Sequence, residues 1–224
     1  MYDIVFISYQ EPNADINWEL LKSRFSFARR VHGVKGIHQA HIAAAAKCFT
    51  DMIWVVDGDA VVLDSFDFDY VPQDPEYVFV WRSKNPINDL EYGNGGIKLL
   101  PRLMTLNMDT NKPDMTTSIS TKFKPIKIVS NITTFNTDPF NTWKSAFREC
   151  CKLASAVIDR QKQDETADRL RIWCTTGNGR AHGDCSIAGA RAGKAYGDAN
   201  KNNLEALKKI NDFEWLDRKF KETL

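Results

Sequence analysis

The stretch that most constrains the fold is an apolar run that ends in two aspartates separated by one glycine, Met52-Ile53-Trp54-Val55-Val56-Asp57-Gly58-Asp59-Ala60. Its β-branched and aromatic side chains predict a strand that is covered on both faces, as in the parallel sheets of α/β proteins. Ligands of such sheets bind beyond the carboxyl ends of the strands, so Asp57 and Asp59 are expected at a ligand-binding edge. Gly58 leaves the backbone between them open to close approach.

A carboxylate pair in this position suits a hard divalent cation. Mg²⁺ and Mn²⁺ prefer oxygen ligands and keep positions free for water and phosphate. We therefore expect Asp57 and Asp59 to hold such a cation against a diphosphate. For the tripeptide alone, a solvated Asp-Gly turn between two strands is the alternative.

Composition places the chain among globular proteins with one substantial core, since 43% of its 224 residues are hydrophobic and 26% are charged. Thirty Lys and Arg against 29 Asp and Glu give a net charge of +1, which neither proposes nor excludes a nucleic-acid partner. No apolar run approaches the roughly 20 residues that span a bilayer, so we expect no membrane span. With no basic leader before the first expected strand, we expect a cytoplasmic location.

Five cysteines are an odd number without zinc-type spacing, so we expect reduced thiols that mostly pack in the interior. Elsewhere, strand and helix signals alternate along the chain. Strands are expected over 4–9, 30–34, 52–57, 76–81, 97–100 and 126–129, and helices around 18–25 and over 37–47, 142–158, 164–173, 186–193 and 204–224. The polar segment 107–124 is expected to be a mobile loop or lid. The pattern predicts one α/β domain with a mainly parallel central sheet and a C-terminal helical tail.

The order of these features resembles the GT-A class of nucleotide-sugar glycosyltransferases. The residues that carry the resemblance are the N-terminal βα unit, Lys35-Gly36 before an alanine-rich helix, the strand that ends in Asp57-Gly58-Asp59, and Tyr92-Gly93-Asn94-Gly95-Gly96 downstream. Within the class the chain is most similar to compact glycosyltransferases of tailed bacteriophages, including those that decorate hydroxymethylated bases in phage DNA. The resemblance implies a Rossmann-like GT-A domain over 1–224, with 1–100 binding the nucleotide sugar, 101–200 facing the acceptor and 201–224 forming the tail.

The resemblance also implies a UDP-sugar donor and Mn²⁺ or Mg²⁺. The turn after the first strand would hold the base and ribose, and an ordinary βα loop is the alternative reading. The implied donor-binding residues are Ser8, Tyr9, Glu11, Asn13, Lys35, Asp57, Gly95 and Gly96. The implied metal ligands are Asp57, Asp59 and a late histidine, His182, which otherwise is a loop histidine without a partner. His38 and His41 are interpreted as structural.

An inverting enzyme of this class needs a base near the acceptor hydroxyl. Glu149 resembles the acidic residue near a helix start that fills this role, and Asp184 is the second candidate. Arg148 stands where the class usually has another acid, so Arg148 and Glu149 could instead form a structural ion pair. A retaining enzyme would need no such base, and both stereochemical outcomes stay open.

The resemblance points to a 5-hydroxymethylcytosine-type base in phage DNA as the acceptor. Such an enzyme would need cations around the site mouth, and Lys112, Lys122, Lys124 and Lys127 could provide them. A saccharide or protein acceptor is the first alternative. A nucleotidyltransferase and a non-catalytic sugar-nucleotide-binding protein are the others, and the oligomeric state stays open.

Overall fold

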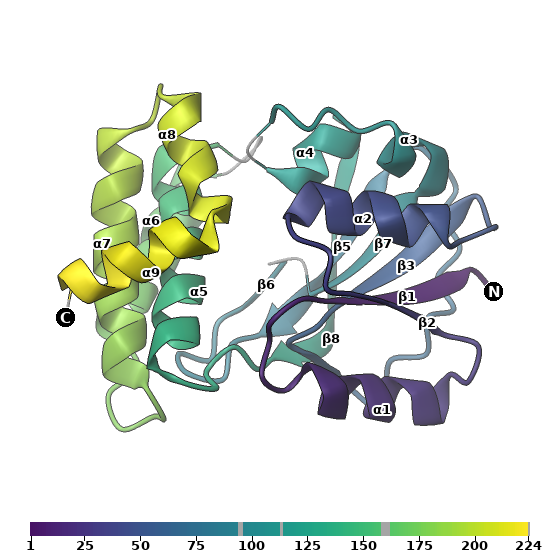
Figure 1. The fold of residues 1–224 in the computed structure, drawn as a ribbon, viewed down its shortest axis with the longest axis horizontal. Helices are drawn as coiled ribbons and strands as arrows, with labels where there is room; N and C mark the ends of the chain where they lie inside the picture. The colour runs from purple at the N-terminus through teal and green to yellow at the C-terminus, as the bar shows by residue number, and fades with distance from the viewer. Residues whose placement is uncertain (94–95, 113, 158–161, 224) are drawn as a thin grey trace. The chain divides into compact units, whose positions relative to one another are not determined.

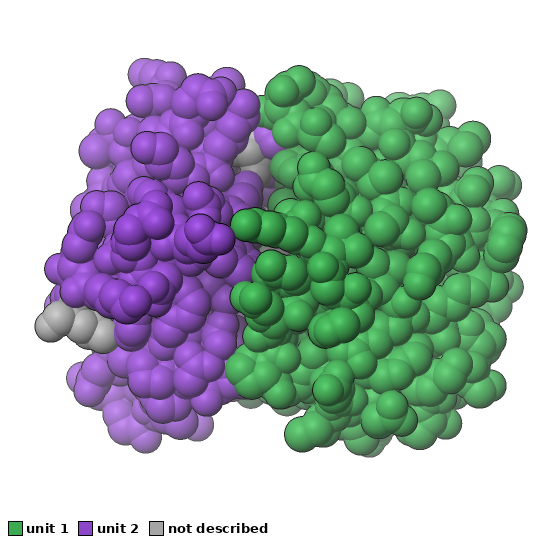
Figure 2. Space-filling view, in the orientation of Figure 1, with its two compact units in different colours: residues 1–85, 91–111, 115–134 green, residues 86–90, 112–114, 135–224 purple. Residues whose placement is uncertain are grey.

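A computed structural model of the chain describes residues 1–93, 96–112, 114–157 and 162–223. The chain divides into two compact units (Figure 2). Unit 1 comprises residues 1–85, 91–111 and 115–134, and unit 2 comprises residues 86–90, 112–114 and 135–224. No helix of the described ranges is long and apolar enough to cross a bilayer.

Unit 1 is built on a sheet whose strand order, among the described residues, is β2-β1-β3-β7-β5-β8-β4, with β6 beside β5. The strands are β1 (Asp3–Ser8), β2 (Arg29–His32), β3 (Met52–Asp57), β4 (Ala60–Val62), β5 (Val78–Lys84), β6 (Glu91–Tyr92), β7 (Ile97–Pro101) and β8 (Phe123–Thr133). The pairs β1/β2, β1/β3 and β5/β8 are parallel, whereas β3/β7, β5/β7, β5/β6 and β4/β8 are antiparallel.

The α/β class is therefore confirmed, but the expected mainly parallel sheet is wrong because the sheet is mixed. The reason lies in the connection between β5 and β7. It passes through β6, and its described residues form no crossover helix; a short connection of this kind returns the chain antiparallel to the strand it left.

The sheet also curls. Only Gly58 and Asp59 separate β3 from β4 along the chain, yet β7, β5 and β8 stand between these two strands in the sheet order. The β8/β4 end of the sheet must therefore return to the carboxyl end of β3. This curl brings residues from β1, β3, β7 and β8 to one place.

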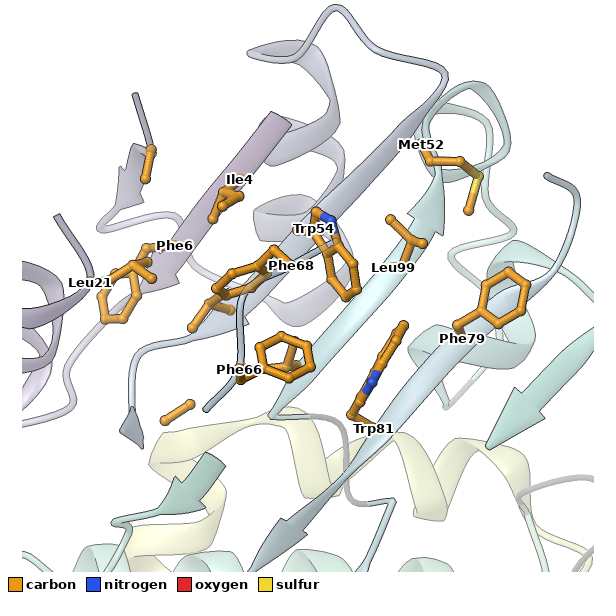
Figure 3. Packing of buried hydrophobic residues seen from close by; sticks show 14 of the residues in the cluster. Ile4, Phe6, Leu21, Met52, Trp54, Phe66, Phe68, Phe79, Trp81 and Leu99 are labelled. Atoms are coloured by element: carbon orange, nitrogen blue, oxygen red, sulfur yellow. The ribbon is translucent and has the colours of Figure 1, made fainter. Parts of the chain in front are cut away.

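Helices cover both faces of this sheet (Figure 1). One face carries α1 (Ala14–Arg24), and the other carries α2 (Ile37–Ala46), α3 (Arg102–Leu106) and α4 (Met115–Ile119). Against the α1 face packs a cluster of aromatic rings, among which Trp54 and Trp81 have centroids 4.6 Å apart (Figure 3). The α2 face is aliphatic, and the small side chains of Ala44 and Ala45 let α2 lie close to the strands.

Part of the segment 107–124, where we expected a loop, forms regular structure, since α4 and the beginning of β8 fall within its described residues. Met115 and Ile119 lie one helical turn apart, and both are buried against the aliphatic face of the sheet. The Thr, Ser and Asn content around them hides this apolar pair from a reading of composition.

Unit 2 is helical, with α5 (Pro139–Ser155), α6 (Gln163–Thr175), α7 (Gly183–Ala199), α8 (Leu204–Lys208), the short 3₁₀ helix η1 (Lys209–Asn211) and α9 (Phe213–Thr223). The small residues of α7 let this helix pack tightly against α5. A Cβ atom on Gly189, Gly193 or Gly197 of α7 would collide with a main-chain carbonyl of α5, at Trp143, Phe147 and Cys151 respectively. The two helices therefore run parallel at a close distance, in contact along a row of glycines spaced four residues apart.

The C-terminal segment is helical, as expected, and α5 anchors it. Arg148 donates from Nε to the carbonyl oxygen of Ile210 at 2.9 Å and from Nη2 to the Oδ1 atom of Asn211 at 3.0 Å. The ammonium of Lys144 lies 4.3 Å from the ring centroid of Phe213. Arg148 thus has a structural role in holding the tail.

Candidate functional site

Asp57 lies at the carboxyl end of β3 and is fixed by two contacts, one with Gly96 just before β7 and one with Lys98 of β7. Its backbone N–H donates to the carbonyl oxygen of Gly96 at 2.9 Å. Its Oδ1 atom accepts a hydrogen bond from the Lys98 ammonium at 2.6 Å. The Lys98 side chain is 3% exposed and that of Asp57 is 29% exposed, so the pair reaches from the interior to the surface. Because a buried ammonium needs a counter-charge, Lys98 holds the Asp57 carboxylate in one orientation.

The turn that follows is held through its backbone. The carbonyl oxygen of Gly58 accepts from the Nδ2 atom of the buried Asn17, at 3.0 Å. The carbonyl oxygen of Asp59 accepts from both the backbone nitrogen and the hydroxyl of Thr134, at 2.7 and 2.8 Å. Both carbonyls are thus engaged from within unit 1, and a ligand at this turn would meet the aspartate side chains.

The loop after β1 packs directly against Gly58. A Cβ atom added to Gly58 would lie 2.9 Å from the Oε2 atom of Glu11 and 3.0 Å from the Cβ of Ser8. Glu11 itself accepts a hydrogen bond from the backbone N–H of Tyr9 at 2.7 Å. Gly58 is required here because any side chain would push this loop away from the two aspartates.

Asn13 ties the same loop to the turn by a second route. Its Nδ2 atom donates to the hydroxyl of Thr134 at 2.6 Å, and Thr134 in turn binds the carbonyl of Asp59. The structure therefore brings the loop residues expected from the sequence, Ser8, Tyr9, Glu11 and Asn13, to the turn that carries Asp57 and Asp59.

The electrostatics of the turn are dominated by negative charge. The pKa of Asp59 is raised to about 7, first by burial and then by the carboxylates of Asp57 and Glu11. The Lys98 ammonium acts in the opposite direction. Three carboxylates facing one ammonium leave a surplus of negative charge at neutral pH, and a bound cation would offset this surplus.

The side chains present fit a divalent cation that is completed by its substrate. Asp57 and Asp59 supply hard oxygen donors. Over the described ranges, no group of three or more His, Cys, Asp and Glu side chains is arranged to hold a metal ion. Unit 1 would therefore supply only these two carboxylates, and water and phosphate can complete the coordination, as is usual for Mg²⁺ at phosphate-binding sites.

The other donor-side residues fall in three places. Gly96 lies beside the aspartate turn, because its carbonyl oxygen binds the Asp57 backbone. A Cβ on Gly96 would be 2.6 Å from the Nδ2 atom of the buried Asn131 on β8. Gly95 lies outside the described residues. Lys35 is exposed in the turn between β2 and α2, on the same edge of the sheet as the end of β1, because β1 and β2 are parallel.

The two candidate bases and the expected metal-binding histidine belong to unit 2. Glu149 lies in the second half of α5, so the expected position near a helix start is wrong. Asp184 is exposed in the first turn of α7. His182 precedes that helix in a left-handed conformation, with φ at 57°.

Three residues of the group were missed by sequence reasoning. Lys98 carries a detectable signal, since it is a lysine inside the apolar strand Ile97–Pro101. Asn17 and Thr134 carry none, because they are 41 and 75 residues away from the partners that they bind. Their role appears only once the sheet has curled.

Comparisons with protein-family models, with curated proteins and with solved structures find no match for this chain. Its fold and site define an α/β protein with a mixed, curled sheet. At the carboxyl end of the third strand, this sheet carries a rigid Asp-Gly-Asp turn with surplus negative charge.

Proposed function

We propose that this protein is a metal-dependent glycosyltransferase that moves a sugar from a UDP-sugar to an acceptor hydroxyl. One observation carries the proposal. The rigid turn of Asp57, Gly58 and Asp59 lies where α/β sheets bind ligands, and burial together with the carboxylates of Asp57 and Glu11 raises the pKa of Asp59 to about 7. Mn²⁺ or Mg²⁺ bound there would supply positive charge for a departing diphosphate.

The chain's own residues divide the remaining tasks. Lys98 orients the Asp57 carboxylate through their 2.6 Å ion pair. The loop of Ser8, Tyr9, Glu11 and Asn13 packs against the turn and is the part of the chain proposed to hold uracil and ribose. Gly58 and Gly96 have no side chain, which lets Glu11 and Asn131 pack close to the backbone beside the carboxylates.

The remaining candidate metal ligand and the candidate bases belong to unit 2. His182 is the proposed third metal ligand. Glu149 and Asp184 are the proposed bases for an inverting reaction, in which a carboxylate removes the proton of the acceptor hydroxyl as the sugar is transferred.

The proposed acceptor is a 5-hydroxymethylcytosine-type base in DNA. Of the lysines expected at such a surface, Lys124 and Lys127 are exposed on β8. Lys122 is engaged by the carboxylates of Asp74 and Glu76, at 3.0 and 2.6 Å, which raises its pKa and offsets its charge. Binding to DNA through Lys124 and Lys127 would weaken steeply as salt is raised.

The test is a donor and acceptor panel. The purified protein is given UDP-sugars with Mn²⁺ and either hydroxymethylcytosine-containing or unmodified DNA, and both UDP release and sugar transfer are measured. We expect Asp59→Asn to reduce turnover by about 100-fold or more, because it removes a charge that acts at the reacting diphosphate. Asp64→Asn is the matched control, since Asp64 is a fully exposed aspartate of the same unit.

Each outcome has a separate meaning. Transfer to modified DNA that is lost in Asp59→Asn supports both the activity and the acceptor. UDP release without transfer to DNA keeps the class of enzyme and moves the acceptor to a saccharide or a protein. Donor binding without turnover identifies a binding protein, and pyrophosphate release from a nucleoside triphosphate identifies a nucleotidyltransferase. Absence of donor binding in the presence of Mn²⁺ would overturn the proposal.

A further inference from the structure

Two of the five cysteines meet between helices of unit 2. All five are free thiols. Cys150 is fully buried on α5, and Cys174 is partly exposed near the end of α6. Cys174 packs against the apolar cluster that contains Cys150, and the two thiols lie close enough for each to act on the pKa of the other. A partly exposed thiol thus lies beside a buried one from a different helix.

Cationic side chains of α7 surround the exposed member of the pair. Arg191 donates from Nε to the carbonyl oxygen of Cys174 at 3.0 Å, which holds its guanidinium beside this residue. Lys194 also acts on the Cys174 sulfur, while its ammonium pairs with Asp198 at 2.7 Å. On the α5 side, the nearby ionisable group is Glu149, which acts on Cys150.

These neighbours make the two thiols unlike each other. The hydrogen bond from Cys150 lowers the pKa of Cys174 to about 7, with help from Lys194 and Arg191 and against the effect of burial. Burial raises the pKa of Cys150 well above its ordinary value, and the contact with Cys174 raises it further. At neutral pH, Cys174 is therefore about half thiolate, the form that reacts with oxidants, while Cys150 keeps its proton.

The remaining cysteines lack this combination. Burial raises the pKa values of Cys48 and Cys151 to about 12. The pKa of Cys185 is also raised, by burial and by Asp184. Cys151 is next to Cys150 in sequence but belongs to a different apolar cluster, so it offers a matched control on the same helix.

We propose that Cys174 and Cys150 form an oxidisable dithiol, which peroxide converts into a disulfide that joins α6 to α5. In the first step, the Cys174 thiolate attacks one peroxide oxygen, the O–O bond breaks, and a sulfenic acid and hydroxide are formed. In the second step, the Cys150 sulfur attacks the Cys174 sulfur, and the hydroxyl leaves as water with the proton of Cys150. Two thiols are oxidised and one peroxide is reduced.

The inference does not depend on sugar transfer, because neither Cys150 nor Cys174 is among the residues proposed to bind the donor or the metal or to act as the base. Its chemical class of substrate is a peroxide, and its product is a cross-link between two packed helices. Oxidation would restrain α6 against α5, and a thiol reductant would reverse it.

The test uses the full chain exposed to hydrogen peroxide at pH 7. Remaining thiols are blocked with N-ethylmaleimide, and the disulfides are mapped by mass spectrometry of non-reduced peptides. We expect a Cys150–Cys174 peptide to form and to disappear with reductant. Cys174→Ser should abolish this peptide. Cys150→Ala should leave a sulfenic acid on Cys174 that dimedone traps, and Cys151→Ser should behave as the natural protein does.

A second measurement needs no variant and so does not depend on folding of the substituted chains. Iodoacetamide labelling of Cys174 in the natural protein, followed by pH, should show a midpoint near 7 and should be faster than labelling of Cys48. Peroxide treatment that leaves both thiols reduced, or that pairs Cys174 with a different cysteine, would overturn the proposal. So would a labelling midpoint at the ordinary thiol pKa near 9.

Discussion

At the scale of single residues, the site depends on one buried lysine placed among carboxylates. Lys98 is 3% exposed and pairs with Asp57, while Asp59 and Glu11 add further negative charge nearby. An ammonium that is this deeply buried stabilises the fold only while its partner is charged, and removing the partner is strongly destabilising. Lys98 therefore offsets the charge of Asp57, with which it forms the ion pair. The negative charge of Asp59 has no such partner in contact with it among the contacts described above.

This surplus predicts a dependence of stability on pH. Asp59 has a pKa of about 7 in the folded chain against a reference value of 3.8, so the folded state holds an extra proton between these pH values. Stability should fall as pH rises through this window, by up to about 4 kcal/mol, and the loss should be complete above pH 7. Asp59→Asn removes the effect. Urea unfolding should show this variant more stable than the natural protein at pH 8 and equally stable near pH 4.

Substitution of Lys98 provides a second test of the pH dependence that Asp59 causes. Lys98 opposes the rise in the pKa of Asp59, so Lys98→Met should move the pH window to higher values. Asp64→Asn, at a fully exposed position, should leave the pH profile unchanged. A difference between Asp59→Asn and the natural protein that stays constant from pH 4 to 8 would contradict this account of the site.

At the scale of elements, the contact between α5 and α7 in unit 2 depends on one residue type, glycine, repeated along one face of α7. Gly189, Gly193 and Gly197 occupy one face of α7 at intervals of one turn, and each sits over a carbonyl of α5. Larger side chains at these three positions of α7 would hold the axes of α5 and α7 further apart. Here the backbones approach until main-chain atoms touch, so the packing tolerates no Cβ along this line.

Helix propensity and packing predict opposite signs for Gly193→Ala. Propensity alone predicts a gain of about 1 kcal/mol, because alanine is the better helix former. The added Cβ, however, would collide with the carbonyl oxygen of Phe147, which cannot move without its helix. We expect a net loss of about 1–3 kcal/mol in the free energy of unfolding, as is usual for overpacked cores. Urea denaturation followed by circular dichroism measures it.

The control for this substitution is on the exposed face of the same helix. Ala195→Gly should cost about 1 kcal/mol through helix propensity alone, because Ala195 is exposed. If Gly193→Ala were instead stabilising, the contact between α5 and α7 would have to be looser than the structure has it.

The sequence predicts where most of these elements lie along the chain better than it predicts how they are arranged in the sheet. Periodicity places β1, α2, β3 and α5 close to their observed bounds, because each has a strong local pattern. It misses β4, which has three residues, and it cannot give the direction of β7, which depends on a connection rather than on side chains. The same limit holds for the site: the sequence predicts that Asp57 and Asp59 belong to it, but it does not predict their contacts with Asn17 and Thr134.

At the scale of the whole molecule, the two units carry different chemistry. Unit 1 holds the carboxylate turn and the loop that packs against it, and unit 2 holds the dithiol and the glycine-packed helices. A ligand that binds the first and an oxidant that reacts with the second should therefore leave separate signatures in one experiment.

Hydrogen exchange followed by mass spectrometry can separate these signatures along the chain. With Mn²⁺ and UDP at about 100 times the dissociation constant, bound protein should gain about 2.7 kcal/mol of stability. We expect amide exchange to slow over 8–13 and 57–59, while peroxide should slow exchange in α5 and α6 instead. Slowing that extends to the residues before α7 would assign His182 a share in binding the cation. Unchanged exchange over 8–13 and 57–59 would show that the donor does not bind at this turn, because a ligand held by Asp57 and Asp59 must restrain the loop in contact with Gly58.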